Sequence, residues 1–305
     1  MDFALDDEQR DLADALDTLL SRHAGPERAQ DLLRRETSDT DVMKRLDEGG
    51  FLNAGPGGVC SLERALLVEA ASRHAALAPV AARALVAAEV LPGDLPLNIA
   101  LAWAGPDAPV RFGAQADLVM SIEGDTTRVF RPESVVSVGG TRQEGYPLGR
   151  VSGPTVAELD AETTARVRAW WQVAIATELA GCLDAVLTKS VSYVRERTQF
   201  GKPLASKQAV QHRLAETAIG LEGSRWLARR AAFAKAPAEL AAAATAYACR
   251  AAGNAFMHVH QVHGAIGITD EYRLTVWTVR MMMLRRELGG VTAHERALGM
   301  ARYVH

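Results

Sequence analysis

The sequence predicts a mainly α-helical protein with a small central β region. Two observations lead to this expectation. Apolar residues recur in steps of three and four through long stretches at both ends of the 305-residue chain. Between them, residues 91–157 break into short β-branched segments bounded by Gly, Pro and Asp. We therefore expect an N-terminal helical domain over 1–90, a shortened β domain over 91–157 and a C-terminal helical bundle over 158–305.

The first 90 residues contain signals for four helices. Asp6 or Asp7 can cap a first helix that ends near Gly25-Pro26. A second helix is expected over about 39–48, because Gly49-Gly50 stops it. The remaining two helices are expected over about 61–73 and 80–89.

The middle of the chain predicts four to six short strands. The clearest candidates are 97–103, 118–122, 127–130 and 134–138.

The last part of the chain predicts long antiparallel helices. The first, over about 160–197, would extend roughly 50 Å at 1.5 Å per residue. Others are expected from about 205, over 237–263, from about 270 and from about 292. Because the connections between them are short, neighbouring helices must run antiparallel and form a four-helix bundle.

Composition excludes several classes of protein. The net charge of −3 argues against a nucleic-acid or membrane binder, which needs a basic surface. No apolar run is long enough for a membrane span. The three cysteines form no disulfide pattern, and the acidic first residues differ from a signal peptide, so we expect a cytoplasmic protein. Cys182 and Cys249 are expected as small core residues.

Common catalytic motifs are absent from the sequence. It contains no HExxH, paired CxxC, GxSxG, GxxxxGK[ST] or strand-borne GxGxxG pattern. His258, His260 and His263 are close in sequence, but on a helix His258 and His260 point about 200° apart. No nearby carboxylate offers a third ligand, so we expect no metal site.

Two segments that contain helix-breaking Gly or Pro residues end long helices, and they differ in chemistry. Residues 195–203, RERTQFGKP, offer cations and an aromatic ring at a helix end. Residues 261–267, QVHGAIG, offer an amide and exposed glycine backbone. The first segment alone is equally typical of a plain turn with solvated cations. Together the two suit a long anionic cofactor, with its diphosphate against arginine and its flat rings against an aromatic.

These segments resemble the C-terminal flavin-binding region of acyl-CoA dehydrogenases. The resemblance covers about residues 165–300, and the first ten residues also resemble that family's N-terminus. It implies an N-terminal helical domain, a central β domain and a C-terminal four-helix bundle, assembled as dimers of dimers. It also implies FAD bound across a subunit interface, with an acyl-CoA as substrate.

The resemblance assigns FAD-binding residues by position in the two segments and the helix between them. These residues reach the adenosine diphosphate half of the cofactor, typically of the FAD whose flavin lies in the neighbouring subunit. They are Arg197, Gln199, Phe200, Gln208, Gln261, Val262, Gly264 and Ala265, of which Ala265 replaces the family's second glycine.

The catalytic base of the family has no clear counterpart. A glutamate is expected before the last helix, where residues 287–292 read ELGGVT with glycine at its place. The alternative family position falls on about Trp171. The family's segment that covers the flavin ring also has no counterpart in the shortened β domain. The catalytic residues therefore stay open, with Glu178, Glu271, Glu287 and Glu295 as candidates.

Three functional hypotheses follow. In the first, the chain is a subunit of a hetero-oligomeric acyl-CoA dehydrogenase, an α2β2 assembly of the kind found in actinobacterial steroid catabolism. A homologous partner then supplies the base and the flavin pocket. In the second, the chain is a self-sufficient homomeric dehydrogenase with a relocated base. In the third it is a non-catalytic homologue, which the retained Arg197–Gly201 pattern disfavours because a scaffold has no need of a diphosphate site.

Overall fold

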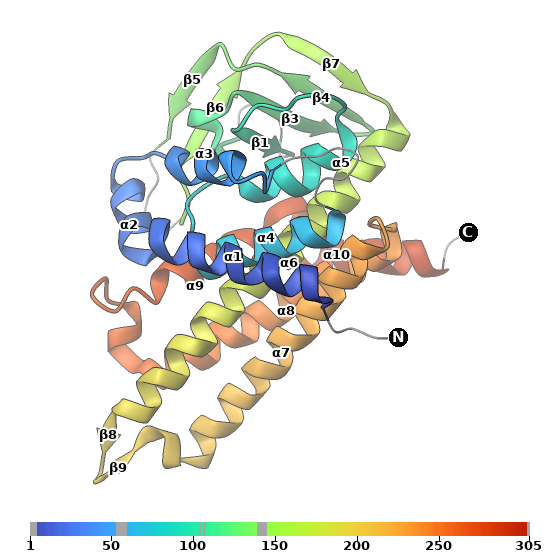
Figure 1. The fold of residues 1–305 in the computed structure, drawn as a ribbon. Helices are drawn as coiled ribbons and strands as arrows, with labels where there is room; N and C mark the ends of the chain where they lie inside the picture. The colour runs from blue at the N-terminus through green and yellow to red at the C-terminus, as the bar shows by residue number, and fades with distance from the viewer. Residues whose placement is uncertain (1–4, 53–59, 104, 106–107, 139–144, 304–305) are drawn as a thin grey trace.

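The computed structural model describes residues 5–52, 60–103, 105, 108–138 and 145–303. Helices make up both ends of the chain, and two small sheets lie together at one end of the molecule (Figure 1). A long helical bundle extends from the sheets toward the opposite end of the molecule (Figure 1). The expected mainly helical fold with a small central β region is therefore confirmed.

The N-terminal helices follow the capping signals of the sequence. Asp6 caps α1, and its carboxylate accepts from the backbone N–H of Gln9 at 2.8 Å. Pro26 begins an additional short helix, since proline is favoured at the first helical position. The helices are α1 (Asp7–His23), α2 (Pro26–Arg34), α3 (Thr40–Glu48), α4 (Ser61–Arg73), the π-helical η1 (Ala81–Ala87) and α5 (Ala88–Val90).

The β region contains seven strands among its described residues, one more than the upper expectation. One sheet has the order β1-β3-β4-β7, in which only the β1–β3 pair is parallel. The other, β2-β6-β5, is antiparallel. The strands are β1 (Ile99–Ala102), β2 (Val110–Arg111), β3 (Leu118–Glu123), β4 (Thr126–Phe130), β5 (Ser134–Ser137), β6 (Leu148–Ser152) and β7 (Thr155–Leu159). A short 3-10 helix, η2 (Gly113–Gln115), follows β2.

The 36-residue helix α6 (Ala161–Glu196) is the axis of the molecule. At 1.5 Å per residue it extends about 54 Å. It packs against α4, α7 and α8, and its central part is buried on nearly every side. Helix α10 packs on α8, and α9 on α6. The remaining C-terminal helices are η3 (Leu204–Ser206), α7 (Gln208–Phe233), α8 (Ala238–His263), η4 (Gly264–Ile268), α9 (Thr275–Leu284), η5 (Glu287–Gly289) and α10 (Gly290–Tyr303).

The core is continuous from the N-terminal helices through the sheet to the bundle. Cys182 and Cys249 are buried free thiols within it, as expected, whereas Cys60 is exposed. No helix in the described ranges has both the length and the apolar character needed to cross a membrane.

Candidate functional site

The RERTQFGKP segment folds as a two-residue β-hairpin at the end of α6. Arg197 follows the last helical residue, and β8 (Thr198–Gln199) pairs with β9 (Lys202–Pro203). Both turn residues are left-handed, with φ of 55° at Phe200 and 75° at Gly201. This is the geometry that a two-residue hairpin requires, but a bulky residue rarely adopts it. Phe200 therefore occupies its position at a conformational cost.

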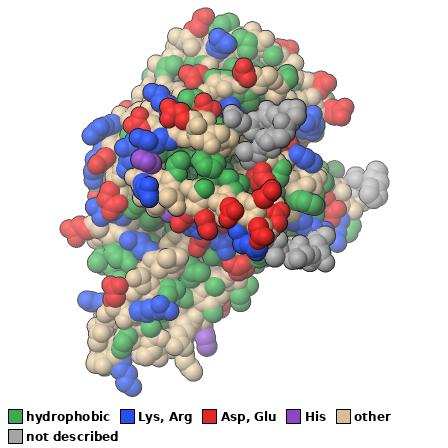
Figure 2. All heavy atoms as spheres, viewed as in Figure 1, with side chains coloured by type: hydrophobic (Ala, Val, Ile, Leu, Met, Phe, Trp, Pro, Cys, Tyr) green, Lys and Arg blue, Asp and Glu red, His purple; other side chains and the backbone are tan. Residues whose placement is uncertain are grey.

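The hairpin is exposed to solvent. The Phe200 side chain is 93% exposed, and its one described ring contact is the Lys207 ammonium, 4.9 Å from the ring centre. Arg197 and Gln199 are exposed as well. The hairpin projects at the end of the bundle farthest from the sheets (Figure 1), and Lys or Arg side chains lie at that end (Figure 2). An exposed aromatic ring among cations is suited to contact a second molecule.

The QVHGAIG segment ends α8 with an exposed stretch of backbone. Gly264 has φ of 64° and ψ of −145°, and no atom lies within 4 Å of the position that a Cβ would take. Gln261 and Ala265 are exposed. The side chain of Val262, by contrast, is buried in a small core cluster. Gln261, Gly264 and Ala265 can therefore face a ligand directly, while the side chain of Val262 serves packing.

The two segments lie at the same end of the bundle. The ring of Tyr193, one turn before Arg197, stacks on His263 with 4.5 Å between ring centres. Val194 and Val262 share a core cluster, which joins α6 to α8. Gln208, the first residue of α7, is exposed and follows the hairpin and η3 in the chain. The fold thus brings the sequence-predicted residues to one end of the bundle, where cations, amides, an aromatic ring and bare backbone fit the chemistry of a dinucleotide's adenosine diphosphate.

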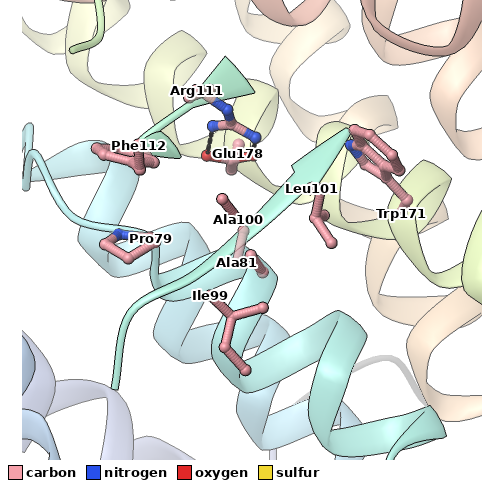
Figure 3. Close-up of a pocket in the computed structure, with 10 residues that line it drawn as sticks. Pro79, Ala81, Ile99, Ala100, Leu101, Arg111, Phe112, Trp171 and Glu178 are labelled. Carbon is pink, nitrogen blue, oxygen red and sulfur yellow. Dashed lines mark hydrogen bonds and ion pairs between the residues drawn. The ribbon is translucent and has the colours of Figure 1, made fainter. Parts of the chain in front are cut away.

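A second polar site lies at the seam between the sheets and the bundle, where the sequence singled out no strand residue. Arg111 on β2 forms a bidentate ion pair with Glu178 on α6, at 2.6 and 3.0 Å (Figure 3). The Arg111 Nε also lies 3.1 Å from a carboxylate oxygen of Glu287. All three side chains are largely buried. We call Arg111, Glu178 and Glu287 the seam triad.

The two segments in which the family resemblance looked for a base, around Trp171 and over 287–292, meet at this triad. Trp171 is buried on α6 and donates its indole N–H to Glu287 at 2.6 Å. Glu287 begins the turn between α9 and α10, which continues through Leu288 at φ of 52° and two glycines at positive φ. Backbone in this region is strained at a residue such as Leu288. The strained turn holds the Glu287 carboxylate in the seam.

Burial controls the charges of the triad. It raises the pKa of Glu287, and the nearby Glu178 carboxylate adds to the rise, against the opposing effects of Arg111 and the Trp171 hydrogen bond. Burial opposes the charge of Arg111, but the two carboxylates keep its pKa well above the usual range. The Arg111 guanidinium thus pairs with both carboxylates, and burial raises the proton affinity of Glu287.

The structure separates the four candidate bases. Glu271 is exposed, and Glu295 pairs with Arg250 on the outer face of the bundle at 2.5 Å. Glu178 uses both carboxylate oxygens on Arg111. Glu287 alone among the four lines a cavity of about 320 Å³ at the seam, together with Trp103, Trp171 and Arg286. We call this the seam cavity.

The three histidines of α8 have separate partners. His258 Nε2 lies 3.3 Å from Glu216, His260 Nε2 lies 3.1 Å from the Thr278 hydroxyl, and His263 Nδ1 lies 2.7 Å from the Val259 carbonyl. Across the described ranges, no group of three His, Cys, Asp or Glu side chains is placed to hold a metal ion.

The bundle matches a known family model. Residues 169–303, from the third turn of α6 to the end of α10, match the model described as "Acyl-CoA dehydrogenase, C-terminal domain". This part of the chain is therefore similar to the C-terminal domain of acyl-CoA dehydrogenases. Acyl-CoA dehydrogenases are FAD-dependent flavoproteins, and both the hairpin and the end of α8 lie inside the matched region.

Three known proteins resemble the chain over most of its length. The chain is 28% identical to acyl-CoA dehydrogenase IpdE2 of Mycobacterium tuberculosis over 226 residues, covering 73% of this chain and 64% of IpdE2. The match thus spans less than two thirds of that relative. The ChsE4-ChsE5 complex from Mycobacterium tuberculosis has a TM-score of 0.78 at 22% identity, with 98% of each chain covered. The Tcur3481-Tcur3483 steroid ACAD variant has a TM-score of 0.81 at 22% identity, with 96% of this chain and 97% of that chain covered. Both structures share the fold.

Proposed function

We propose that the chain is a subunit of a flavin-dependent acyl-CoA dehydrogenase that desaturates an acyl-CoA thioester between its α and β carbons. In this proposal it contributes to an FAD site shared across the interface with a homologous subunit. That partner supplies the catalytic base and the pocket for the flavin ring, in an α2β2 assembly.

The observation that carries the proposal is the exposed hairpin. Phe200 is both strained and almost fully exposed, and Gly264 at the same end of the bundle leaves its backbone open. Within the described chain nothing covers either feature. A folded chain gains nothing from such a hairpin unless another molecule contacts it. A dinucleotide held between two subunits is such a molecule.

The relatives support a mixed assembly and a steroid-type substrate. One is named as a complex of two different chains, ChsE4 and ChsE5, and another as a two-component steroid ACAD. For this chain we propose the same arrangement, with a steroid-derived acyl-CoA as substrate.

The roles of this chain's own residues follow from their chemistry. Arg197 would neutralise the diphosphate, Phe200 would pack on a flat ring of the cofactor, and Gln208 and Gln261 would hydrogen-bond its polar groups. The backbone of Gly264 and Ala265 would approach the cofactor closely. When bound, FAD supplies the acceptor for the hydride that leaves the substrate's β carbon.

A pair of arginine variants tests the shared site. Arg197→Ala should strongly reduce the flavin that copurifies with the complex of this chain and its partner. Arg195→Ala removes the same charge two residues away, on the last turn of α6, and should leave flavin content unchanged. Equal flavin content in the two variants would remove Arg197 from the site and count against the proposal.

A second candidate function is a self-sufficient homomeric dehydrogenase with Glu287 as its base. The observation that favours it is that Glu287 lines the seam cavity and has a raised pKa, as a proton acceptor near neutral pH requires. Glu287→Gln should then abolish turnover by the chain purified alone. If the homomeric chain turns over and the variant retains full turnover, Glu287 is not the base.

A further inference from the structure

Three cavities lie in a row between the sheets and the bundle. The seam cavity and a small inner cavity of about 10 Å³ share Leu101, Arg111 and Trp171 as lining residues. A third, also about 10 Å³, shares Ala81 and Glu178 with the second. The row therefore runs from the seam, past β1 and η1, to the interface of α4 and α6.

The Arg111–Glu178 ion pair lies where the large seam cavity meets the two small inner cavities. Arg111 lines the first two cavities, and Glu178 lines the second and third. Figure 3 shows the two side chains meeting between the strands and α6, beside Ala100 and Leu101. Much of the remaining lining of the inner cavities is alanine: Ala71, Ala76, Ala78, Ala81, Ala82 and Ala100. These small side chains leave room beside the ion pair, and Ser72, Tyr146 and Arg280 also line the third cavity.

Stability does not explain the choice of charged residues here. A buried ion pair loses solvation on both partners, and apolar side chains of similar volume fill such a space equally well or better. A charged pair differs from apolar residues in one respect. An apolar chain that entered the passage would separate the guanidinium from the carboxylate and could not hydrogen-bond to either, which costs free energy.

We propose that the Arg111–Glu178 pair closes an internal acyl channel, so that an acyl tail cannot pass beyond the seam cavity of this chain. The inference deepens the proposed function and rests on it: the acyl group that is oxidised is held by the partner subunit. The class of ligand excluded is a long, apolar acyl thioester.

The test compares two double variants of the full chain. R111A/E178A removes the pair and leaves its space empty, whereas R111M/E178L removes the pair and keeps the space filled. The probe is the non-reactive thioether analogue of hexadecanoyl-CoA, titrated by calorimetry, with CoA itself measured in parallel to subtract binding of the head group. Circular dichroism and thermal unfolding check that each variant is folded.

R111A/E178A should bind the hexadecanoyl analogue on the order of a hundredfold more tightly than the wild type, after subtraction of CoA binding, as expected for about four newly buried methylene groups. In the wild type and in R111M/E178L the tail should add the same affinity as each other, because in both it stops at the seam cavity.

Three results would overturn the proposal. They are an equal gain in both double variants, a folded R111A/E178A without any gain over the wild type, and a gain in R111M/E178L alone. A gain in R111M/E178L, which keeps the space filled, overturns the proposal even if R111A/E178A fails to fold. Flavin content of the complex, measured on the same preparations, reports separately on the proposed function, because an open channel leaves the FAD-binding end of the bundle unchanged.

Discussion

Phe200 combines two costs at a single residue. Its left-handed backbone is unfavourable for a side chain with a Cβ, by roughly 1–2 kcal/mol, and its ring is almost wholly exposed. Neither cost is offset by packing within the chain, where its described ring contact is with the exposed Lys207. A residue retained for folding alone would be glycine or asparagine at this place. We therefore expect stability and cofactor binding to respond oppositely to its replacement.

Phe200→Gly should keep the free energy of unfolding of the chain unchanged or raise it by up to about 1 kcal/mol, because it relieves the left-handed strain. The same change should lower the flavin retained by the complex. Phe200→Tyr keeps the aromatic ring and should keep the flavin. Chemical unfolding of the chain and flavin absorbance of the complex are the two measurements. A marked loss of stability in Phe200→Gly would show that the ring serves the fold.

The seam triad was only partly visible in the sequence. Glu178 and Glu287 were candidates among four glutamates, and Trp171 marked one of the family positions for a base. Nothing singled out Arg111, because it lies on a two-residue strand among ordinary surface-like sequence. Its role arises from tertiary placement: the β2–β6 pairing turns the side chain toward α6. Sequence periodicity reports which face an element buries, and it cannot report which distant acid meets a given arginine.

At the scale of elements, the crossing of α4 and α6 depends on one glycine. A Cβ built on Gly181 would lie 2.3 Å from the backbone carbonyl oxygen of Glu69 and 2.7 Å from the Cβ of Ser72. The two helices therefore approach so closely that no side chain fits between them at this point. Glycine ordinarily weakens a helix interior by about 1 kcal/mol relative to alanine, so its presence in α6 reflects packing.

Gly181→Ala should lower the free energy of unfolding by about 1–3 kcal/mol, since the overpacking outweighs the gain in helix propensity. Gly299→Ala is the matched control. Gly299 lies in α10 with no atom within 4 Å of its would-be Cβ, so the same change should raise stability by about 0.5–1 kcal/mol. Denaturant unfolding of both variants measures the contrast. If both substitutions change the free energy of unfolding in the same direction, the close helix crossing is contradicted.

Long periodic elements were predicted from sequence, and so were several short ones, but not all. The expected helix over about 160–197 is α6, and that over 237–263 is α8. Helix α2 was missed because Gly25-Pro26 was taken as a stop, whereas Pro26 also starts the next helix. The sequence did not predict strands β2, β6 and β7 either. The residues of β7 are mostly exposed, so it lacks the apolar alternation that identifies a strand.

At the scale of the whole molecule, the two polar sites lie far apart in the fold. The hairpin and the end of α8 form an exposed end of the bundle, distant from the sheets (Figure 1). The seam triad lies beneath the sheets, beside the middle of α6. A chain with one exposed polar end and one tightly paired interior suits a subunit that completes a neighbour's site. The central claim is that FAD is held jointly by this chain and a homologous partner.

The most direct measurement is the flavin absorbance per mole of protein. It is taken on the chain purified alone, and on the complex purified after co-expression with a full-length homologous subunit. We expect little or no flavin in the chain alone and a yellow, active complex that contains both subunits. A chain that carries stoichiometric FAD and turns over acyl-CoA without a partner would contradict it.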